Sequence, residues 1–157
     1  LILGAAGKSG TLCCYEASKR VGPTGRVVGL VYSEAEKTDL QAIGACDEII
    51  LADATKPVDV LEKSLAANHG EEYDISICCV NVNSCEMSAI LPVKDDGTVY
   101  FFSMATSFTK AALGAEGCGK DINMIIGNGY TKGHAEITLN ELRENEKIRE
   151  MFDKKYL

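Results

Sequence analysis

The chain has 157 residues, of which 46% are hydrophobic and 25% are charged, and its formal net charge is −7. This composition excludes a disordered chain and suits one globular domain. The acidic balance argues against nucleic-acid binding, which needs a basic face, and no apolar run approaches the ~20 residues of a membrane-spanning helix. Seven cysteines without C-x-x-C spacing indicate reduced thiols in a cytoplasmic protein rather than secreted disulfides or a zinc site.

Hydrophobic periodicity predicts strands and helices that alternate along the whole chain. Strands are expected at residues 1–3, 26–31, 48–51, 75–80, 98–102 and 123–126. Helices are expected at residues 9–20, 34–43, 58–67, 84–91, 107–113 and 133–143, the last continuing irregularly toward residue 152. Ser33 and Glu36 form a capping box at the start of the second helix, and Gly44 stands at the left-handed position that ends it.

This alternation predicts an α/β fold of the Rossmann type, with a doubly wound, parallel, six-stranded sheet in three αβα layers. The strands are apolar almost throughout, which indicates that both faces of the sheet are buried. No linker or repeat divides the chain, so residues 1–157 are predicted to form a single dinucleotide-binding domain. Because the chain opens directly in an apolar strand, we expect an upstream catalytic domain to be missing.

A glycine loop with the spacing G-x-x-G-x-x-G joins the first strand to the first helix. This strand–loop–helix context is typical of a dinucleotide fingerprint, in which the glycines permit a tight turn, close approach of the diphosphate and close helix packing. A turn that needs glycines but binds nothing is the alternative. The sequence therefore predicts NAD or NADP as cofactor, with a diphosphate site made of Gly4, Ala6, Gly7, Lys8, Ser9 and Gly10.

The end of the second strand leaves the choice between NAD and NADP open. NAD enzymes usually carry an acid there, whereas residues 31–34 read Val-Tyr-Ser-Glu and Glu34 comes slightly late. Ser33 and Lys37 suit a 2′-phosphate, although Ser33 is equally well explained as a helix cap. Tyr32 and Ser33, together with Asp53 after the third strand, are predicted to contact the adenosine half.

Short polar and glycine residues follow the fourth, fifth and sixth strands. Ligands of such sheets bind outside the carboxyl ends of the strands, although Asn and Gly are also common turn formers. Glu86 is the carboxylate nearest to this region and is the candidate proton acceptor or ammonium partner; no other catalytic residue and no metal ligand is assigned. The nicotinamide half is predicted to contact Asn81, Val82, Ser103, Met104, Gly127 and Asn128.

Several longer sequence segments together resemble the L-erythro-3,5-diaminohexanoate dehydrogenase family of anaerobic lysine fermentation. These segments are LGAAGKSG, RVVGLVYSEAE, CVNVNSCEM, GTVYFFSMATSFTKAALGAEG and DINMIIGNGYTKGHAE. More broadly, the chain is similar to the cofactor domain of medium-chain dehydrogenases. The resemblance implies NAD(P)-dependent oxidative deamination of a diamino acid to 5-amino-3-oxohexanoate, in a cleft shared with a separate domain. It implies that this part alone is inactive, and we expect a homo-oligomer at full length. An NAD(H)-sensing regulatory module and the cofactor domain of a quinone or enone reductase are the alternatives.

Overall fold

The computed structural model describes residues 1–127 and 130–157, and within these residues six parallel strands form one sheet in the order β3-β2-β1-β4-β5-β6. The strands are β1 (Ile2–Leu3), β2 (Val28–Val31), β3 (Glu48–Leu51), β4 (Tyr73–Cys78), β5 (Val93–Phe101) and β6 (Asn123–Ile126). The helices are α1 (Lys8–Arg20), α2 (Glu34–Ile43), α3 (Pro57–Ala67), α4 (Glu86–Ile90), α5 (Phe108–Cys118), α6 (His134–Glu144) and α7 (Glu146–Tyr156). The predicted doubly wound fold is confirmed.

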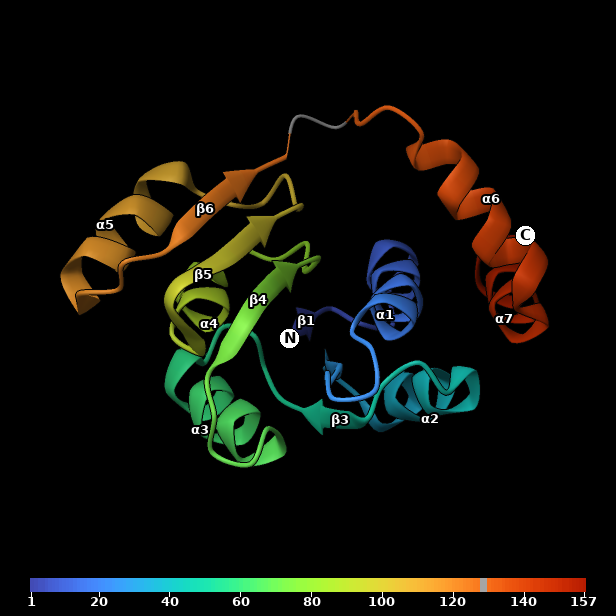
Figure 1. Cartoon of the computed structure of the whole chain (residues 1–157), viewed down its shortest axis with the longest axis horizontal. Coiled ribbons are helices and arrows are strands. Elements are labelled where there is room, and N and C mark those ends of the chain that lie inside the picture. Colours follow the sequence, from blue (N-terminus) through green and yellow to red (C-terminus); the bar gives the residue numbers. More distant parts are fainter. Residues whose placement is uncertain (128–129) are drawn as a thin grey trace.

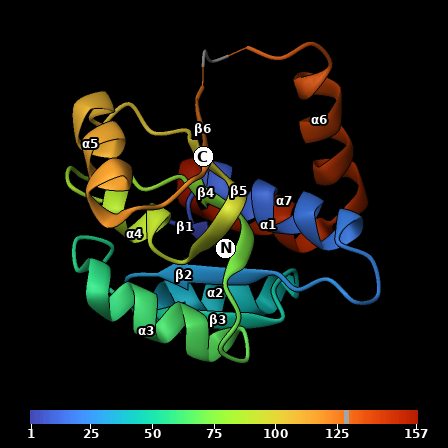
Figure 2. The same ribbon diagram turned by 60° about the vertical axis from the view of Figure 1, so that its left-hand side comes forward.

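The helices form two outer layers around the sheet. Helices α3, α4 and α5 lie on one side, and α1, α2, α6 and α7 lie on the other (Figures 1 and 2). The strand order reverses beside β1, whose two neighbours are β2 and β4. In sheets of this kind the ligand binds outside the carboxyl ends of the strands at that reversal, so the glycine loop that follows β1 stands at the expected place.

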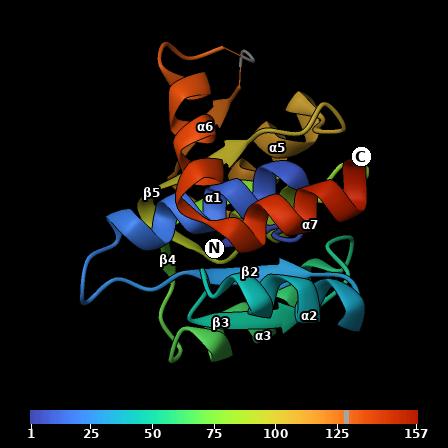
Figure 3. The ribbon, with the colours of Figure 1, turned by 90° about the vertical axis from the view of Figure 1, so that its right-hand side faces the viewer.

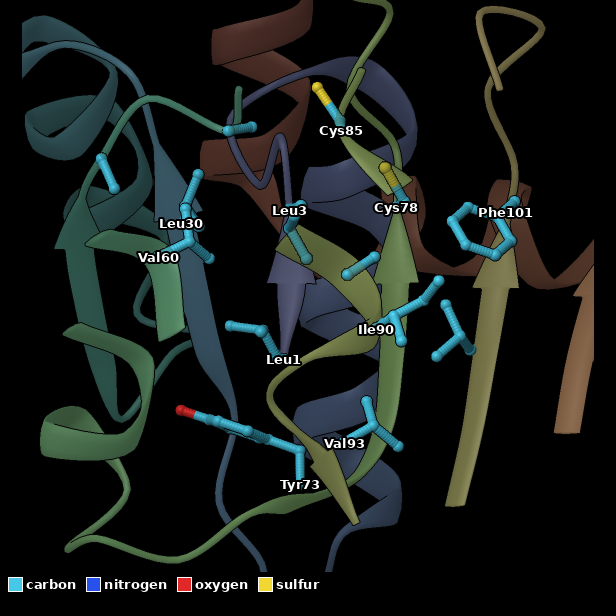
Figure 4. Packing of buried hydrophobic residues seen from close by; sticks show 14 of the residues in the cluster. Leu1, Leu3, Leu30, Val60, Tyr73, Cys78, Cys85, Ile90, Val93 and Phe101 are labelled. Carbon is cyan, nitrogen blue, oxygen red and sulfur yellow. The ribbon is translucent and has the colours of Figure 1, made fainter. Parts of the chain in front are cut away.

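Two hydrophobic clusters fill the space between the sheet and its helices. Successive residues of a strand point to opposite faces, and accordingly Leu3 belongs to the cluster under α3, α4 and α5, whereas Ile2 belongs to the cluster under α1 and α2. Figure 4 shows the first cluster, in which Leu3, Ile90 and Phe101 are almost completely buried. These contacts fix the carboxyl ends of β1, β4 and β5 relative to one another.

The C-terminal segment forms two helices instead of one irregular helix. The break falls at Asn145, whose side chain accepts a hydrogen bond of 3.2 Å from the amide of Ile148 and so begins α7. Helix α6 packs against α1 and helix α7 packs against α2 (Figure 3). Among the described residues, no helix has both the length and the apolar character that crossing a bilayer demands.

One sequence expectation about the sheet is wrong: its two faces are not buried throughout. On the α1 side of β4, β5 and β6, about half of the surface of Ile75, Phe102 and Ile125 is exposed. Tyr100 shares this face and stacks on Phe102, with ring centroids 6.5 Å apart. The reason is the path of the chain after β6, because α6 and α7 pack on α1 and α2 and leave this part of the sheet uncovered (Figure 1).

Candidate functional site

The glycine loop is shaped by close backbone contacts. Gly4 adopts a left-handed conformation with φ of +73°, and a Cβ there would stand 3.1 Å from the backbone of Cys79 and Val80. A Cβ on Gly10 would stand 2.1 Å from the carbonyl oxygen of Gly4. Since real side chains do not tolerate such approaches, these two glycines allow α1 to start directly beside the ends of β1 and β4.

Gly7 differs from the other two glycines because the space around it is open. Its backbone is extended, with φ of −77°, and a Cβ there would meet only the carbonyl oxygen of Gly4, at 3.4 Å. Gly7 is the N-cap of α1, no described side chain caps this helix, and its first turn contains no acidic residue. The amides of the first turn and the positive end of the helix dipole therefore form a surface that suits an anion.

Two cavities open on either side of this helix start and share Gly7, Cys79 and Asn81. The first cavity has a volume of about 550 Å³ and is lined by Gly4, Ala6, Gly7, Leu30, Tyr32, Glu36, Ala52, Asp53, Ala54, Thr55, Cys79, Val80, Asn81, Val82 and Cys85. The second cavity has a volume of about 730 Å³ and is lined by Gly7, Lys8, Ser9, Gly10, Cys79, Asn81, Phe102, Ser103, Met104 and Gly127. Both volumes fall in the range of small-molecule sites.

The structure brings the sequence-predicted positions together around these cavities. Every predicted cofactor-binding position among the described residues lines one cavity or both, except Ser33. The Ser33 hydroxyl accepts a hydrogen bond from the amide of Glu36, so Ser33 acts as the cap of α2. Asn128 lies outside the described residues. Contact of the lining residues with a dinucleotide stays a prediction.

The loops after β4 and β5 meet at the rim of the second cavity. The Ser103 hydroxyl donates a hydrogen bond of 3.3 Å to Oδ1 of Asn81, and it accepts one from the amide of Ala105. After β6, a Cβ on Gly127 would stand only 2.4 Å from the hydroxyl oxygen of Tyr100, so a larger residue there would require the Tyr100 side chain to shift. The second cavity thus combines amide and hydroxyl groups with the exposed aromatic ring of Phe102.

Two carboxylates line the first cavity. The Asp53 carboxylate accepts hydrogen bonds from the hydroxyl and the amide of Thr55, and these bonds hold the pKa of Asp53 below its ordinary value. The Glu36 carboxylate accepts hydrogen bonds from the amides of Tyr32 and Ser33, at 2.8 and 3.2 Å. Sequence reasoning treated Glu36 only as a capping residue, yet the capping box itself predicts that this carboxylate folds back over the end of β2.

Glu86, the candidate proton acceptor, lies elsewhere. It is only 4% exposed, and its Oε1 accepts a hydrogen bond of 2.7 Å from the amide of Ser107 at the start of α5. It is not among the residues that line either cavity. The position of Glu86 therefore explains how α5 is anchored, and it gives no support to a role in proton transfer.

The remaining reactive groups near the cavities are thiols. Cys85 lines the first cavity, and its burial raises the pKa of the thiol to about 11. A hydrogen bond with Cys13, together with burial, raises the pKa of Cys79 as well. Both are therefore neutral thiols near neutral pH and poor nucleophiles. Within residues 1–127 and 130–157, no group of three or more His, Cys, Asp or Glu side chains is arranged to hold a metal ion.

Two curated relatives are similar to this sequence over all or nearly all of its length. The identity is 71% over 157 residues, or 100% of the chain, to L-erythro-3,5-diaminohexanoate dehydrogenase of Acetoanaerobium sticklandii. It is 62% over 156 residues, or 99% of the chain, to the enzyme of the same name of Fusobacterium nucleatum. The chain is therefore similar to curated L-erythro-3,5-diaminohexanoate dehydrogenases. It spans 46% and 45% of the lengths of these two diaminohexanoate dehydrogenases. No protein-family model matches the chain.

Solved structures confirm the fold. The 2R,3R-butanediol dehydrogenase of Bacillus subtilis is similar with a TM-score of 0.63 and 19% identity, covering 93% of this chain and 40% of that one. A mycobacterial protein complexed with NADPH is similar with a TM-score of 0.59 and 14% identity, covering 99% of this chain and 46% of that one. Like the diaminohexanoate dehydrogenases, both are more than twice as long as the matched region. At these identities the likeness shows the fold alone.

Proposed function

We propose that this chain is the dinucleotide-binding part of an NAD(P)-dependent dehydrogenase that oxidatively deaminates L-erythro-3,5-diaminohexanoate. The observation that carries this proposal is the identity of 71% and 62% to two diaminohexanoate dehydrogenases, which extends over the whole chain. The glycine loop and the two cavities support this proposal. The start of α1 suits an anion, and it lies between two cavities of a size that fits a nucleotide.

The residues present fit a dinucleotide laid across the carboxyl ends of the strands. The first-turn amides of α1 at residues 7–10 would hold the diphosphate, where a Cβ on Gly7 would have open space in front of it. The lining of the first cavity would hold the adenosine half and that of the second cavity the nicotinamide half, where Asn81 and Ser103 would offer hydrogen-bonding groups to its carboxamide. Asn128, which lies outside the described residues, stays a predicted contact on this side.

When bound, the nicotinamide supplies the hydride acceptor for the C3–H bond of the substrate. The substrate imine that results is hydrolysed by water, which releases ammonia and leaves 5-amino-3-oxohexanoate. The residues of this chain bind and orient, because none of the described side chains at the second cavity is a carboxylate or a histidine. We therefore assign the general base, and with it turnover, to the part of the longer protein that lies outside this chain.

Two further parts of the proposal concern the cellular location and the oligomeric state of the protein. The cysteines of the described residues are all free thiols, which supports a reducing, cytoplasmic location. We also propose that the full-length protein is a homo-oligomer. The alternatives of an NAD(H) sensor and of a quinone or enone reductase are less well supported, since both curated relatives are named diaminohexanoate dehydrogenases.

A pair of glycine variants tests dinucleotide binding. Gly7→Ala places a methyl group in the diphosphate site, where a Cβ meets only the carbonyl oxygen of Gly4 at an ordinary contact distance of 3.4 Å, whereas Gly117→Ala places one on α5, where a Cβ meets nothing within 4 Å. Both backbones accept alanine, so both variants are expected to fold, and Gly117→Ala, which lies within α5, is expected to be at least as stable as the wild type. We expect Gly7→Ala to weaken NADH and NADPH binding at least about tenfold by fluorescence titration, and Gly117→Ala to leave it unchanged. Equal binding by both variants would refute the loop assignment.

The reaction is tested with the full-length protein. Oxidation of L-erythro-3,5-diaminohexanoate is followed by the appearance of reduced cofactor at 340 nm and by release of ammonia, with NAD and with NADP. Product in stoichiometric amounts with ammonia supports the proposal. A full-length protein that binds dinucleotide but yields no product with either cofactor would show that the substrate is a different one.

A further inference from the structure

We propose that Cys13 and Cys79 form a thiol-modification site beside the glycine loop, where a peroxide converts the two free thiols into a reversible disulfide that weakens dinucleotide binding. The effect on binding rests on the proposed function, because it concerns the same helix start, whereas formation of the disulfide does not depend on it. Cys79 directly follows β4 and lines both cavities, and Cys13 lies in the second turn of α1.

Helix α1 brings two pairs of thiols together. The side chain of Cys13 is hydrogen bonded to that of Cys79, and the side chain of the next residue, Cys14, is hydrogen bonded to that of Cys46, just before β3. Neighbouring residues of a helix point in directions about 100° apart, so the two pairs reach different segments of the chain. Only the first pair includes a residue that lines the cavities.

The first pair is also within reach of a small oxidant. Cys13 and Cys79 are each partly exposed, whereas Cys14 is completely buried in the hydrophobic cluster under α1 and α2. Because Cys79 lines both cavities, a molecule as small as hydrogen peroxide can approach this pair from the side where the dinucleotide would bind.

The remaining cysteines lie away from this pair. Cys78 and Cys85 belong to the cluster on the opposite face of the sheet, under α3, α4 and α5 (Figure 4). Cys118 is exposed at the end of α5, where its thiol donates a hydrogen bond to the carbonyl oxygen of Ala115. The structure therefore offers Cys79 one neighbouring thiol as its partner, that of Cys13.

The two thiols have different roles in the oxidation. A hydrogen bond donated by Cys79 lowers the pKa of Cys13, against the effects of burial and of the Glu141 carboxylate. The Cys13 thiolate attacks one oxygen of hydrogen peroxide, so that an S–O bond forms, the O–O bond breaks, and the departing hydroxide takes up a proton and leaves as water. Cys13 is then a sulfenic acid.

Cys79 completes the reaction. Its sulfur attacks the sulfur of Cys13, the S–S bond forms and the S–O bond breaks, and the departing hydroxide takes the proton of Cys79 to give a second water. In sum, the two thiols are oxidised to a disulfide and the peroxide is reduced to water. A dithiol such as dithiothreitol reverses the modification by thiol–disulfide exchange.

The disulfide would disturb the start of α1. It brings the two sulfur atoms to about 2.05 Å, much closer than a hydrogen bond does. The backbone of Cys79 is held in place, because its amide donates a hydrogen bond of 2.9 Å to Leu3 and its carbonyl carbon packs beside Gly4. The adjustment therefore falls on α1, whose first-turn amides form the anion-binding surface.

The modification is tested on the full-length protein. It is treated with hydrogen peroxide, the remaining thiols are alkylated, and digestion followed by mass spectrometry identifies the peptides that are joined. We expect a peptide pair joined through Cys13 and Cys79, which dithiothreitol separates again. Fluorescence titration should show NADH bound at least about tenfold more weakly after oxidation, and restored binding after reduction.

Two serine variants separate this pair from oxidation elsewhere. Cys13→Ser keeps a small hydrogen-bonding side chain and lies outside both cavity linings, so it should bind NADH like the reduced wild type and should not respond to peroxide. The matched control is Cys46→Ser, which removes a partly exposed thiol of the other pair and should respond like the wild type. Thermal unfolding shows that each variant is folded. Should Cys13→Ser fail to fold, the peroxide response of Cys79→Ser decides instead.

Three results would overturn the inference: no peptide pair joined through Cys13 and Cys79 in the oxidised wild type, a joined pair with NADH binding unchanged, or a full loss of binding on oxidation of Cys13→Ser. Failure of the proposed function looks different, since then the reduced wild type binds neither NADH nor NADPH while the disulfide still forms.

Discussion

The interface between α1 and α6 contains a carboxyl group whose titration should be measurable as a change in stability. Glu141 on α6 is only 2% exposed. Burial, and to a smaller extent the Glu16 and Glu144 carboxylates, raise the pKa of Glu141 to about 7, against the opposing effect of Lys19. The folded protein therefore keeps a proton on Glu141 that the unfolded chain, with an ordinary pKa of 4.5, has already released between pH 5 and 7.

The sign and size of the effect follow from this difference. Stability from Glu141 is fully present below pH 4.5 and is lost as the pH rises through about 7, because the folded state binds more protons. At 1.36 kcal/mol per pH unit, the loss amounts to about 3 kcal/mol at most. Glu141→Gln cannot lose a proton, so its stability should fall less between pH 5 and 8 by up to that amount.

Urea unfolding followed by circular dichroism at pH 5, 6, 7 and 8 measures this difference. The control is Glu136→Gln on the same helix, where the side chain is mostly exposed and pairs with Arg143. The control should follow the wild type in parallel. If Glu141→Gln also ran parallel to the wild type across this range, Glu141 would be ionised in the folded protein and the reasoning about its burial would be refuted.

Three other changes probe the fold around the site. Phe101→Ala, which empties the volume of a side chain that is 1% exposed, should lower the free energy of unfolding by roughly 3–5 kcal/mol in urea titrations. Ser33→Ala removes the hydroxyl that caps α2 and should cost about 1 kcal/mol in the same assay. Gly10→Ala drives a methyl group against the backbone oxygen of Gly4 and should cost about 1–3 kcal/mol; a wild-type melting temperature in this variant would contradict the loop geometry.

Sequence reasoning was most accurate where local chemistry decides the structure. The helix expected at residues 34–43 has these bounds because Ser33 caps its start and Gly44, with φ of +71°, ends it. The glycine loop was predicted for the same kind of reason, since its spacing depends on backbone approaches that only glycine permits. In such segments the residue types and the backbone conformation determine each other.

Sequence reasoning failed where contacts between segments that are distant in the chain determine the structure. Strand β5 begins at Val93, five residues before the expected start, because Val93 pairs with Tyr73 although polar residues follow it. The uncovered face of β4–β6 depends on where α6 and α7 pack, which no local pattern records. Glu36 was recognised as a capping residue but not as a lining residue of the first cavity, because the cavity needs β3 and β4 beside it.

The two cavities share part of their lining, and this affects how molecules bound in the two cavities would influence each other. Since Gly7, Cys79 and Asn81 belong to both, two separate mononucleotides would each lose translational freedom and would crowd each other at the helix start. A single molecule that joins both halves loses that freedom once, and the second half then binds at a high effective concentration. The arrangement of the two cavities thus favours the binding of one molecule that covalently links two weakly binding halves.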